Sequence, residues 1–376
     1  MTSALPPEAW AAALAELPGM GPARLLALVL RWKPDVAWAR VSDGSWIREP
    51  SLATAFRRGA HHLAERWAHA AALVDVHARW DEHVRAGVGV ASIGSAAFPA
   101  VLADDVEPPG VLFWRGDPAV ISGPRVAIVG TRAATRYGID VAFELGRDLA
   151  AAGVAVVSGL ARGIDGAAHA GAINGQTGPP VAVVGSGLDV IYPSDHGPLW
   201  REVERRGVVL TEAPLGARPT RWRFPARNRL IAALADALVV VESRQQGGSM
   251  HTVDEAIRRG RTVYAVPGPV RSAASAGTNR LLGEGALPVS DASDVLVGLG
   301  LTSALRRCTT DHRPVPDAAD AVVLDGLGWQ PASIDQLALR CGLDIGSLAV
   351  ALTRLGADGW VRERDGWYER VAGGDD

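Results

Sequence analysis

The stretch RVAIVGTRAATRYG, residues 125–138, decides the fold of the central part of this chain. A short apolar run, 126–129, ends at Gly130, as the first strand of a nucleotide-binding sheet does. A dinucleotide fold then needs two more glycines in the pattern G-x-G-x-x-G, so that a pyrophosphate can approach the backbone. Here Thr131 and Arg132 follow, and the arginine stands where the second glycine belongs. The loop is therefore expected to hold an anion other than a dinucleotide.

Apolar segments recur after this stretch and alternate with helical ones. Strands that are apolar throughout and separated by helices predict a parallel sheet covered on both faces. The sequence therefore predicts an α/β fold, a doubly wound parallel sheet of the extended Rossmann-like kind, over residues 125–300. The expected strands are 125–130, 154–158, 181–185, 208–211, 237–242 and 262–266, and the expected helices lie near 137–152, 164–175, 195–206, 225–235 and 249–260.

Residues 1–85 precede the sheet and are rich in Ala, Leu and Trp, which predicts a helical domain of the helix-hairpin-helix or SAM-like kind. Within it, LAELPGMGPARLLAL (14–28) has the pattern of a helix-hairpin-helix, whose glycine turn presents backbone N–H groups to a DNA phosphate. A plain helical packing unit has the same pattern, so both interpretations stay open. Residues 86–124, rich in Gly and Pro, are expected to form an irregular connector.

The C-terminal part is expected to comprise a polar linker, 301–318, and a winged-helix domain, 319–376. GWVRERDGWYERV (359–371) alternates like two short strands around Asp365-Gly366, which is a hairpin signal. The expected recognition helix, 345–356, has Arg354 as its only cation, so protein contact is at least as well supported as duplex reading. Helix-turn-helix spacing around Gly342 is set by Leu337, Leu343, Leu348, Leu352 and Leu355.

Composition describes an ordinary soluble globular protein, with 48% hydrophobic and 21% charged residues and a net charge of −3. Any nucleic-acid site must therefore be a local patch. Lys33 is the only lysine, which we attribute to genome base composition, and the remaining cations are arginines, planar forks suited to phosphate and to base stacking. A secretory leader pattern and an apolar run of about 18–20 residues are both missing, so we expect a cytoplasmic protein without membrane insertion.

The loops that follow the strands meet at one edge of such a sheet, where ligands of open α/β folds bind. Loops of this kind supply backbone N–H groups and hydroxyls to an anion. One Gly-Ser loop is usually an ordinary strand-to-helix turn, but several on the same edge predict an anion-binding site. Glycine is combined with Ser or Thr at 130–132, 158–165, 185–189 and 243–252.

The loop after the fourth strand sharpens the prediction. Between Ala213 and Ala235 there is no acidic residue, and Trp222 and Phe224 stand among the cations. Cations that follow a backbone, with rings for bases to stack on, hold single-stranded nucleic acid without reading its sequence. Phe224 is the better stacking candidate, because Trp222 could instead be a buried anchor. The five arginines are Arg218, Arg221, Arg223, Arg227 and Arg229.

Catalytic patterns are missing from this edge. The sequence offers no Ser-His-Asp arrangement and no cluster of metal ligands there, so we expect no enzyme activity, no metal and no cofactor. His169 is expected to be a capping or packing residue. The carboxylates Asp165, Asp189 and Glu242 are separate, and each is expected to organise a loop.

These motifs together resemble the DNA-processing protein A (DprA/Smf) family of bacterial recombination mediators. The resemblance spans nearly the whole α/β domain, and the flanking domains fit as well. It implies binding of single-stranded DNA in a basic pocket, a homodimer formed near 277–290, and loading of RecA recombinase on incoming DNA, chiefly in natural transformation. The matching motifs are VAIVGTR (126–132), SGLARGIDGAAH (158–169), VGSGLDVIYP (184–193), FPARNRLIAALADALVVVE (224–242), GSMHT (248–252), GRTVYAVPG (260–268) and GTNRLLGEGA (277–286).

By position, the resemblance implies that Arg132 binds a phosphate and that Phe224 contacts a base at the pocket mouth, beside Arg227 and Asn228. Gln246 and Gly247 stand where the family commonly has a basic residue and a serine. This weakens the positive charge of the glycine loop that contains Gly248, so part of the binding is expected on the loop 212–229 instead, which we call the arginine loop. The resemblance and the loop chemistry together assign to DNA the residues Gly130, Thr131, Arg132, Ser158, Gly159, Arg162, Gly163, Arg221, Arg223, Phe224, Arg227, Asn228, Gly248, Ser249 and Thr252.

Three other classes of protein compete with this interpretation. A nucleoside-monophosphate phosphoribohydrolase of the lysine-decarboxylase-like fold is the main one, although Gln246-Gly247-Gly248-Ser249 lacks its Pro-Gly-Gly-x-Gly-Thr motif. A nicotinamide-dependent oxidoreductase is disfavoured by Arg132. A duplex-binding regulator would act through the winged helix, which is poor in cations.

Overall fold

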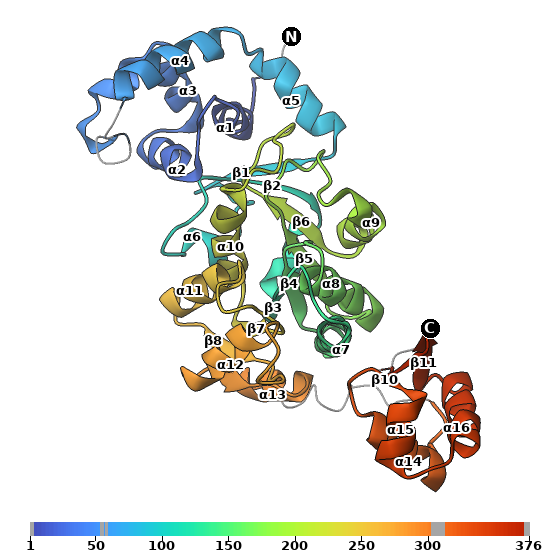
Figure 1. Ribbon diagram of the computed structural model, residues 1–376. Coiled ribbons are helices and arrows are strands. Elements are labelled where there is room, and N and C mark those ends of the chain that lie inside the picture. The colour runs from blue at the N-terminus through green and yellow to red at the C-terminus, as the bar shows by residue number, and fades with distance from the viewer. Residues whose placement is uncertain (1–3, 53–55, 57–58, 302–312, 372–376) are drawn as a thin grey trace.

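The computed structural model describes residues 4–52, 56, 59–301 and 313–371. Helices at the N-terminus cover one end of a large central sheet, and a small helical unit at the C-terminus lies beyond the other end (Figure 1). The central sheet determines the position of the candidate site.

The N-terminal helices pack as a bundle around tryptophan. Trp46 and Trp67 are 1% and 0% exposed, and their ring centroids lie 5.2 Å apart. A proline in the first turn of α1, α2 and α3 presets the helical φ angle, which explains why each helix begins there. The turn 16–21 joins α1 to α2, so the expected helical hairpin is present. The helices are α1 (Pro7–Ala15), α2 (Pro22–Arg31), α3 (Pro34–Ser42), α4 (Ala60–Ala72) and α5 (Val76–Arg85), with 3-10 turns η1 (Ser45–Arg48) and η2 (Pro50–Leu52).

The central sheet has nine strands in the order β1-β2-β6-β5-β4-β3-β7-β8-β9. All pairs from β6 to β9 are parallel, so the predicted doubly wound sheet is confirmed, each predicted strand within about two residues. The strands are β1 (Gly89–Ser92), β2 (Val111–Gly116), β3 (Arg125–Val129), β4 (Ala155–Ser158), β5 (Pro180–Val183), β6 (Val208–Thr211), β7 (Ala237–Val240), β8 (Thr262–Ala265) and β9 (Leu287–Pro288).

The expectation of an irregular connector at 86–124 is wrong. This segment contains β1 and β2, which add an antiparallel edge to the sheet through the pairing of β2 with β6. It also contains α6 (Ala100–Ala103) and the 3-10 turn η3 (Pro118–Ser122). The prediction failed because both strands are short and lie among glycines and prolines.

Helices cover both faces of the sheet. Side chains alternate along β3, so that Val126 and Ile128 pack towards α7 and α8 while Ala127 and Val129 pack towards α10. The strand order reverses between β3 and β7, which is the topological switch point of the fold. The helices are α7 (Arg136–Ala151), α8 (Ile164–Gly175), α9 (Gly197–Arg206), α10 (Arg223–Leu234), α11 (Met250–Arg258), α12 (Ala276–Gly283) and α13 (Ala292–Gly298), with a 3-10 turn η4 (Ser194–His196).

The N-terminal helices and the sheet share one hydrophobic core. Leu14 and Leu28 of the helical part belong to the same buried cluster as Val111 and Phe113 of β2. All four side chains are at most 1% exposed. The helical hairpin is therefore held in a fixed place beside the α/β part.

The C-terminal unit is a winged helix, as predicted. Helices α15 and α16 flank Gly342, and strands β10, β12 and β11 form a separate three-stranded sheet. The predicted linker, 301–318, lies mostly outside the described residues. Within the described chain no single helix is long and apolar enough to span a membrane, although α15 and α16, bent by 107°, pass that test as a pair. The elements are α14 (Ala318–Leu327), β10 (Ala332–Ser333), α15 (Ile334–Cys341), α16 (Ile345–Ala357), β11 (Val361–Arg364) and β12 (Trp367–Arg370).

Candidate functional site

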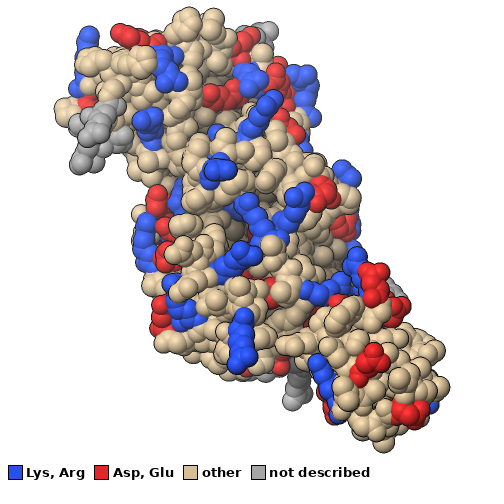
Figure 2. All heavy atoms as spheres, viewed as in Figure 1, with Lys and Arg blue, Asp and Glu red and all other residues tan. Residues whose placement is uncertain are grey.

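A cleft of ≈ 690 Å³ lies at the switch point, beyond the carboxyl ends of β3 and β7. We call it the switch-point cleft. Its walls are the loop 130–132, the loop 244–252 and the first turns of α10. Lys and Arg side chains are spread over the middle of this face, whereas Asp and Glu lie mainly towards its margins (Figure 2).

The loop after β3 is fixed by Glu242, which is 2% exposed. The backbone N–H of Thr131 donates to the Glu242 carbonyl oxygen at 2.7 Å. The Glu242 carboxylate accepts hydrogen bonds from the hydroxyl and the backbone N–H of Thr135, at 2.6 and 2.9 Å, where α7 begins. The interpretation that Glu242 organises a loop is therefore confirmed. Glu242 fixes the loop through Thr131 and Thr135, and the exposed Arg132 of this loop lines the cleft.

Arg132 lies over an aromatic ring. Its guanidinium carbon is 4.7 Å from the centroid of Phe224, which is a cation–π distance. The ring of Tyr192 lies 5.7 Å from that of Phe224 and also lines the cleft. Among the described residues, Arg132 and Arg221 make no ion pair, so both guanidinium groups are available to an anion.

Two largely buried side chains of opposite charge, Arg227 and Asp165, line the floor of the cleft. Arg227 is 6% exposed and donates to the carbonyl oxygen of Val183, and its Nε has no partner among the described residues. Burial lowers the pKa of Arg227 to about 10, while nearby Asp165 raises it. Burial raises the pKa of Asp165, while Arg227 lowers it. The expectation that Arg227 sits at the pocket mouth is therefore wrong: it belongs to the floor.

Gly159 makes room for this floor arginine. A Cβ atom at Gly159 would lie 2.0 Å from a terminal nitrogen of Arg227, so a larger residue would displace the guanidinium. Ser158 is fully buried and donates to the carbonyl oxygen of Ile128 at 2.6 Å. Both residues therefore support the cleft without lining it.

The rest of the loop after β4 is also structural. Gly163 has a φ of 76°, and a Cβ atom there would lie 2.4 Å from the Thr131 carbonyl oxygen. Arg162 donates to both carboxylate oxygens of Asp195, each at 3.0 Å, and both side chains are exposed. Neither Arg162 nor Gly163 is among the residues that line the switch-point cleft.

The loop after β7 presents backbone more than hydroxyls. Ser249 is 7% exposed, and its hydroxyl donates to the Ser243 hydroxyl at 2.8 Å. Thr252 is 1% exposed. Gly248 is exposed, and its carbonyl oxygen accepts a hydrogen bond from the Asn228 side chain at 3.4 Å. The expected cradle at Gly248, Ser249 and Thr252 does line the cleft, but its hydroxyls are turned largely inwards.

Four consecutive residues, 221–224, face two different hollows. Arg221 and Phe224 line the switch-point cleft, whereas Trp222 and Arg223 line a neighbouring hollow against the helical hairpin. Arg223 therefore does not line the switch-point cleft with Arg132 and Phe224. Trp222 is 51% exposed, so it is not a buried anchor.

Several cleft residues were not predicted. Tyr192 and Asp165 lie within quoted motifs and yet were not assigned to the site, and Arg244 and His251 complete the rim. The peptide bond between Tyr192 and Pro193 is cis. The signal that could have found Tyr192 is its position directly before a proline, at the end of a loop that follows a strand.

The histidine closest to the floor is structural. His169 is fully buried, and its Nε2 lies 3.3 Å from the carbonyl oxygen of Val181. Burial lowers the pKa of His169 to about 4. Within the described part of the chain, no group of three or more His, Cys, Asp or Glu residues is arranged to hold a metal ion.

The fold is that of a doubly wound α/β protein whose switch-point cleft has available arginines beside two neighbouring rings, an arrangement suited to an anion. Residues 89–300 match the family model of the DNA recombination-mediator protein A, and residues 309–366 match that of the DprA winged helix domain. The chain therefore belongs to the DNA recombination-mediator protein A (DprA/Smf) family.

Known proteins agree with this assignment. A putative DNA processing protein DprA of Mycobacterium tuberculosis (strain CDC 1551 / Oshkosh) is 42% identical over 273 residues, which cover 70% of this chain and 69% of the relative. The X-ray structure of DprA from Streptococcus pneumoniae matches with a TM-score of 0.63 and 29% identity, over 77% of this chain and 96% of that one. A Helicobacter pylori DprA structure, described by its single-stranded DNA binding mode, matches with a TM-score of 0.51 and 28% identity, over 56% of this chain and 95% of that one.

Proposed function

We propose that this protein binds single-stranded DNA in the switch-point cleft and acts as a recombination mediator. The observation that carries the proposal is the position of Arg132, which has no ion pair within the described chain and lies over Phe224 in a cleft of ≈ 690 Å³. A guanidinium group suits a phosphate, and an accessible ring suits an unstacked base. Arg221 adds a second available cation on the same wall.

The proposed role is protection of incoming DNA and loading of RecA recombinase on it, in natural transformation or general recombination, by binding and without catalytic turnover. It rests on membership of the family and on a relative whose structure is described by its single-stranded DNA binding mode. We also propose a cytoplasmic homodimer. Strand β9 is the edge of the sheet, and its Leu287 is 47% exposed, which favours a second copy at this edge.

Binding of a fluorescent oligo-dT strand and of the matching duplex tests the proposed function. The single strand is expected to bind much more tightly, because a base in a duplex cannot reach the Phe224 ring. Equal affinity for the two, or no binding of the single strand, would overturn the proposal. Nucleoside monophosphates provide a control, since release of base from them would instead indicate an enzyme.

Loading of RecA and formation of a dimer need separate measurements. RecA filament growth on a single strand should start faster when this protein is present, and unchanged nucleation would remove the loading role while leaving DNA binding intact. Light scattering should give the mass of a dimer for the wild type. A Leu287→Arg variant should give the monomer mass, whereas an unchanged mass would move the interface away from β9.

A further inference from the structure

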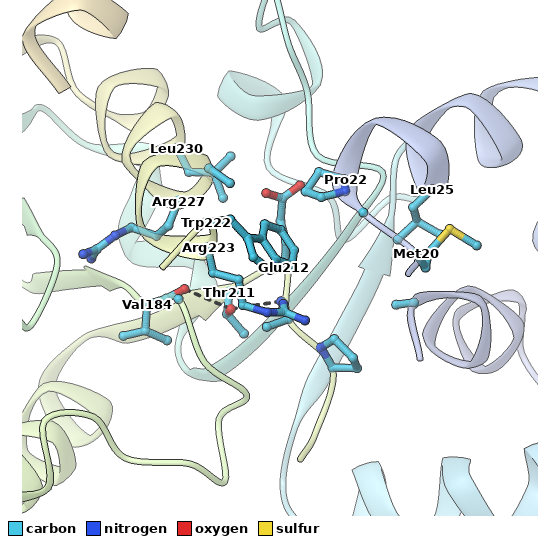
Figure 3. A pocket seen from close by; sticks show the side chains of 16 residues that line it. Met20, Pro22, Leu25, Val184, Thr211, Glu212, Trp222, Arg223, Arg227 and Leu230 are labelled. Carbon is cyan, nitrogen blue, oxygen red and sulfur yellow. Dashed lines mark hydrogen bonds between the residues drawn. The ribbon is translucent and has the colours of Figure 1, made fainter. Parts of the chain in front are cut away.

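The arginine loop separates two clefts. Arg221 and Phe224 face the switch-point cleft, and the intervening Trp222 and Arg223 face a second hollow of ≈ 610 Å³. We call this hollow the hairpin cleft. Its other walls are the turn 16–21 of the helical hairpin and the loop 214–217. Figure 3 shows Trp222 and Arg223 between the start of α10 and the hairpin residues Met20, Pro22 and Leu25.

Trp222 presents a large ring to this hollow. It is 51% exposed, although indole is among the largest apolar surfaces a protein can bury. The guanidinium carbon of Arg223 lies 4.7 Å from the Trp222 ring centroid. The hairpin cleft therefore repeats the pairing of a cation and a ring that Arg132 and Phe224 make on the other side of the loop.

Arg223 is an available cation. Among the described residues it makes no ion pair and no side-chain hydrogen bond. The nearby Glu212 forms an ion pair with Arg229, and burial raises the pKa of Glu212 to about 7. Its carboxylate therefore competes only weakly with a bound anion for Arg223. On the opposite wall, Arg79 is held by Glu16 at 2.7 Å.

The hairpin turn adds backbone donors. The N–H groups of Gly19 and Gly21 have no acceptor within the described part of the chain. Helix α2 begins directly after them and has no side-chain cap. Free amides at the start of a helix favour an anion, and Gly19 and Gly21 line the same hollow as Arg223.

We propose that the hairpin cleft is a second subsite for the same single strand, which crosses the arginine loop from the switch-point cleft and places a base on Trp222 and a phosphate near Arg223. This inference rests on the proposed function. A single strand fits better than a peptide because one loop, 221–224, forms a wall of both clefts and carries a cation and a ring on each side. A chain with alternating phosphates and bases can use both faces in succession.

Two strand lengths test the proposal in the full-length protein. An oligo-dT of about 6 nucleotides should fill the switch-point cleft alone, and one of about 20 nucleotides should reach both clefts. Trp222→Ala should weaken binding of the long strand about tenfold and leave the short strand unchanged. Trp222→Phe should keep most of the affinity for the long strand, because a ring is retained.

Arg223→Gln isolates the charge. It should lower the slope of log affinity against log salt by about 0.7 for the long strand alone, the value for one phosphate contact on a single strand. Trp329→Ala is the matched control, since Trp329 is 50% exposed and carries Arg370 at 4.8 Å over its ring in the winged helix. It should bind both strands as the wild type does.

The outcomes separate this inference from the proposed function. If Trp222→Ala and Arg223→Gln bind both lengths normally while Phe224→Ala loses both, the second subsite is wrong and the first stands. Equal weakening of both lengths by Trp222→Ala also overturns the second subsite. If the wild type binds neither strand, the proposed function itself fails.

Discussion

In the switch-point cleft, Arg132 lies 4.7 Å from the Phe224 ring centroid and makes no ion pair among the described residues. In the winged helix, Arg354, the only cation of α16, donates to both carboxylate oxygens of Asp320 at 3.1 and 2.6 Å. Among the described residues, the cleft keeps Arg132 and Arg221 free of ion pairs, whereas helix α16 has its single arginine neutralised. The pairing of these arginines, rather than their number, distinguishes the proposed DNA-binding cleft from the expected recognition helix.

Exposed apolar residues also distinguish the winged helix from the cleft. Leu339, Ile345 and Val350 of the winged helix are 87%, 55% and 58% exposed. Such a surface suits a protein partner better than a phosphate backbone.

Removal of the floor arginine should have the largest effect. Arg227→Ala removes a positive charge near Asp165, which is 8% exposed, and the hydrogen bond that Arg227 donates to the Val183 carbonyl oxygen. A buried acceptor without its donor, together with the lost charge interaction, lowers the free energy of unfolding by about 3 kcal/mol. Urea denaturation measures this loss. Arg221→Ala, at an exposed position in the same cleft, is the control and should change stability by less than about 0.5 kcal/mol. Equal effects of the two substitutions would contradict the assignment of Arg227 to the floor.

Acid should weaken the part of the molecule that supports the cleft. The pKa of His169 is lowered from 6.5 to about 4, so between these values only the unfolded chain takes up the proton. The stability contribution is therefore complete above pH 6.5 and is lost as the pH falls towards 4, by up to about 3 kcal/mol. The winged helix, residues 313–371, contains no histidine.

Denaturation at two pH values on either side of this window checks the sign. The wild type should lose more stability on acidification than His169→Gln, since other titrating groups contribute equally to both proteins. A variant with the same pH dependence as the wild type would show that His169 does not titrate on unfolding.

Loss of the stacking ring should weaken DNA binding alone. Phe224→Ala is expected to reduce the affinity for single-stranded DNA by about 1–3 kcal/mol, the contribution of one base stacked on an aromatic side chain. Phe224→Tyr should retain most of the affinity. Trp367→Ala removes a ring that is 46% exposed on the wing of the winged helix, and it should leave the affinity unchanged. If Trp367→Ala is the more damaging variant, the two regions have been assigned the wrong way round.

The smallest effect is expected in the winged helix. Arg354→Gln should leave DNA affinity unchanged, because this guanidinium already bonds to Asp320. It should lower stability only slightly, since half of the Arg354 side chain is exposed to solvent. A clear loss of DNA affinity in a fluorescence titration would give the winged helix a direct role in DNA binding.

Strands β3 to β8 could be predicted because each contains a continuous apolar run, buried along almost its whole length in β3 to β7. The parallel edge strand β9 has two exposed residues and was not predicted. Strands β1 and β2 could not be predicted, since Gly89–Ser92 is short and its neighbours are turn-forming residues. Strand β1 pairs with β2, and the antiparallel pairing of β2 with β6 depends on a partner almost 100 residues away in the chain.

The sequence predicted the edge of the sheet at which the candidate site lies, but fewer of the contacts that its side chains make. Sequence placed Arg132, Arg221 and Phe224 correctly beside one cleft. It could not show that Arg162 bonds to Asp195, 33 residues away, or that the Ser249 hydroxyl turns inwards. Arg223 is the first residue of α10, whereas the sequence predicted that helix to begin near 225, so the orientation of Arg223 was not foreseeable.

The central claim is that Arg132 neutralises a phosphate of single-stranded DNA. The most direct test is the affinity for an oligo-dT strand across a salt series, for the wild type and Arg132→Ala, with Arg354→Gln as the control. The account predicts that Arg132→Ala reduces the slope of log affinity against log salt by about 0.7, whereas Arg354→Gln leaves it unchanged. An unaltered slope for Arg132→Ala would contradict the account, because the loop after β3 would then not hold the DNA phosphate.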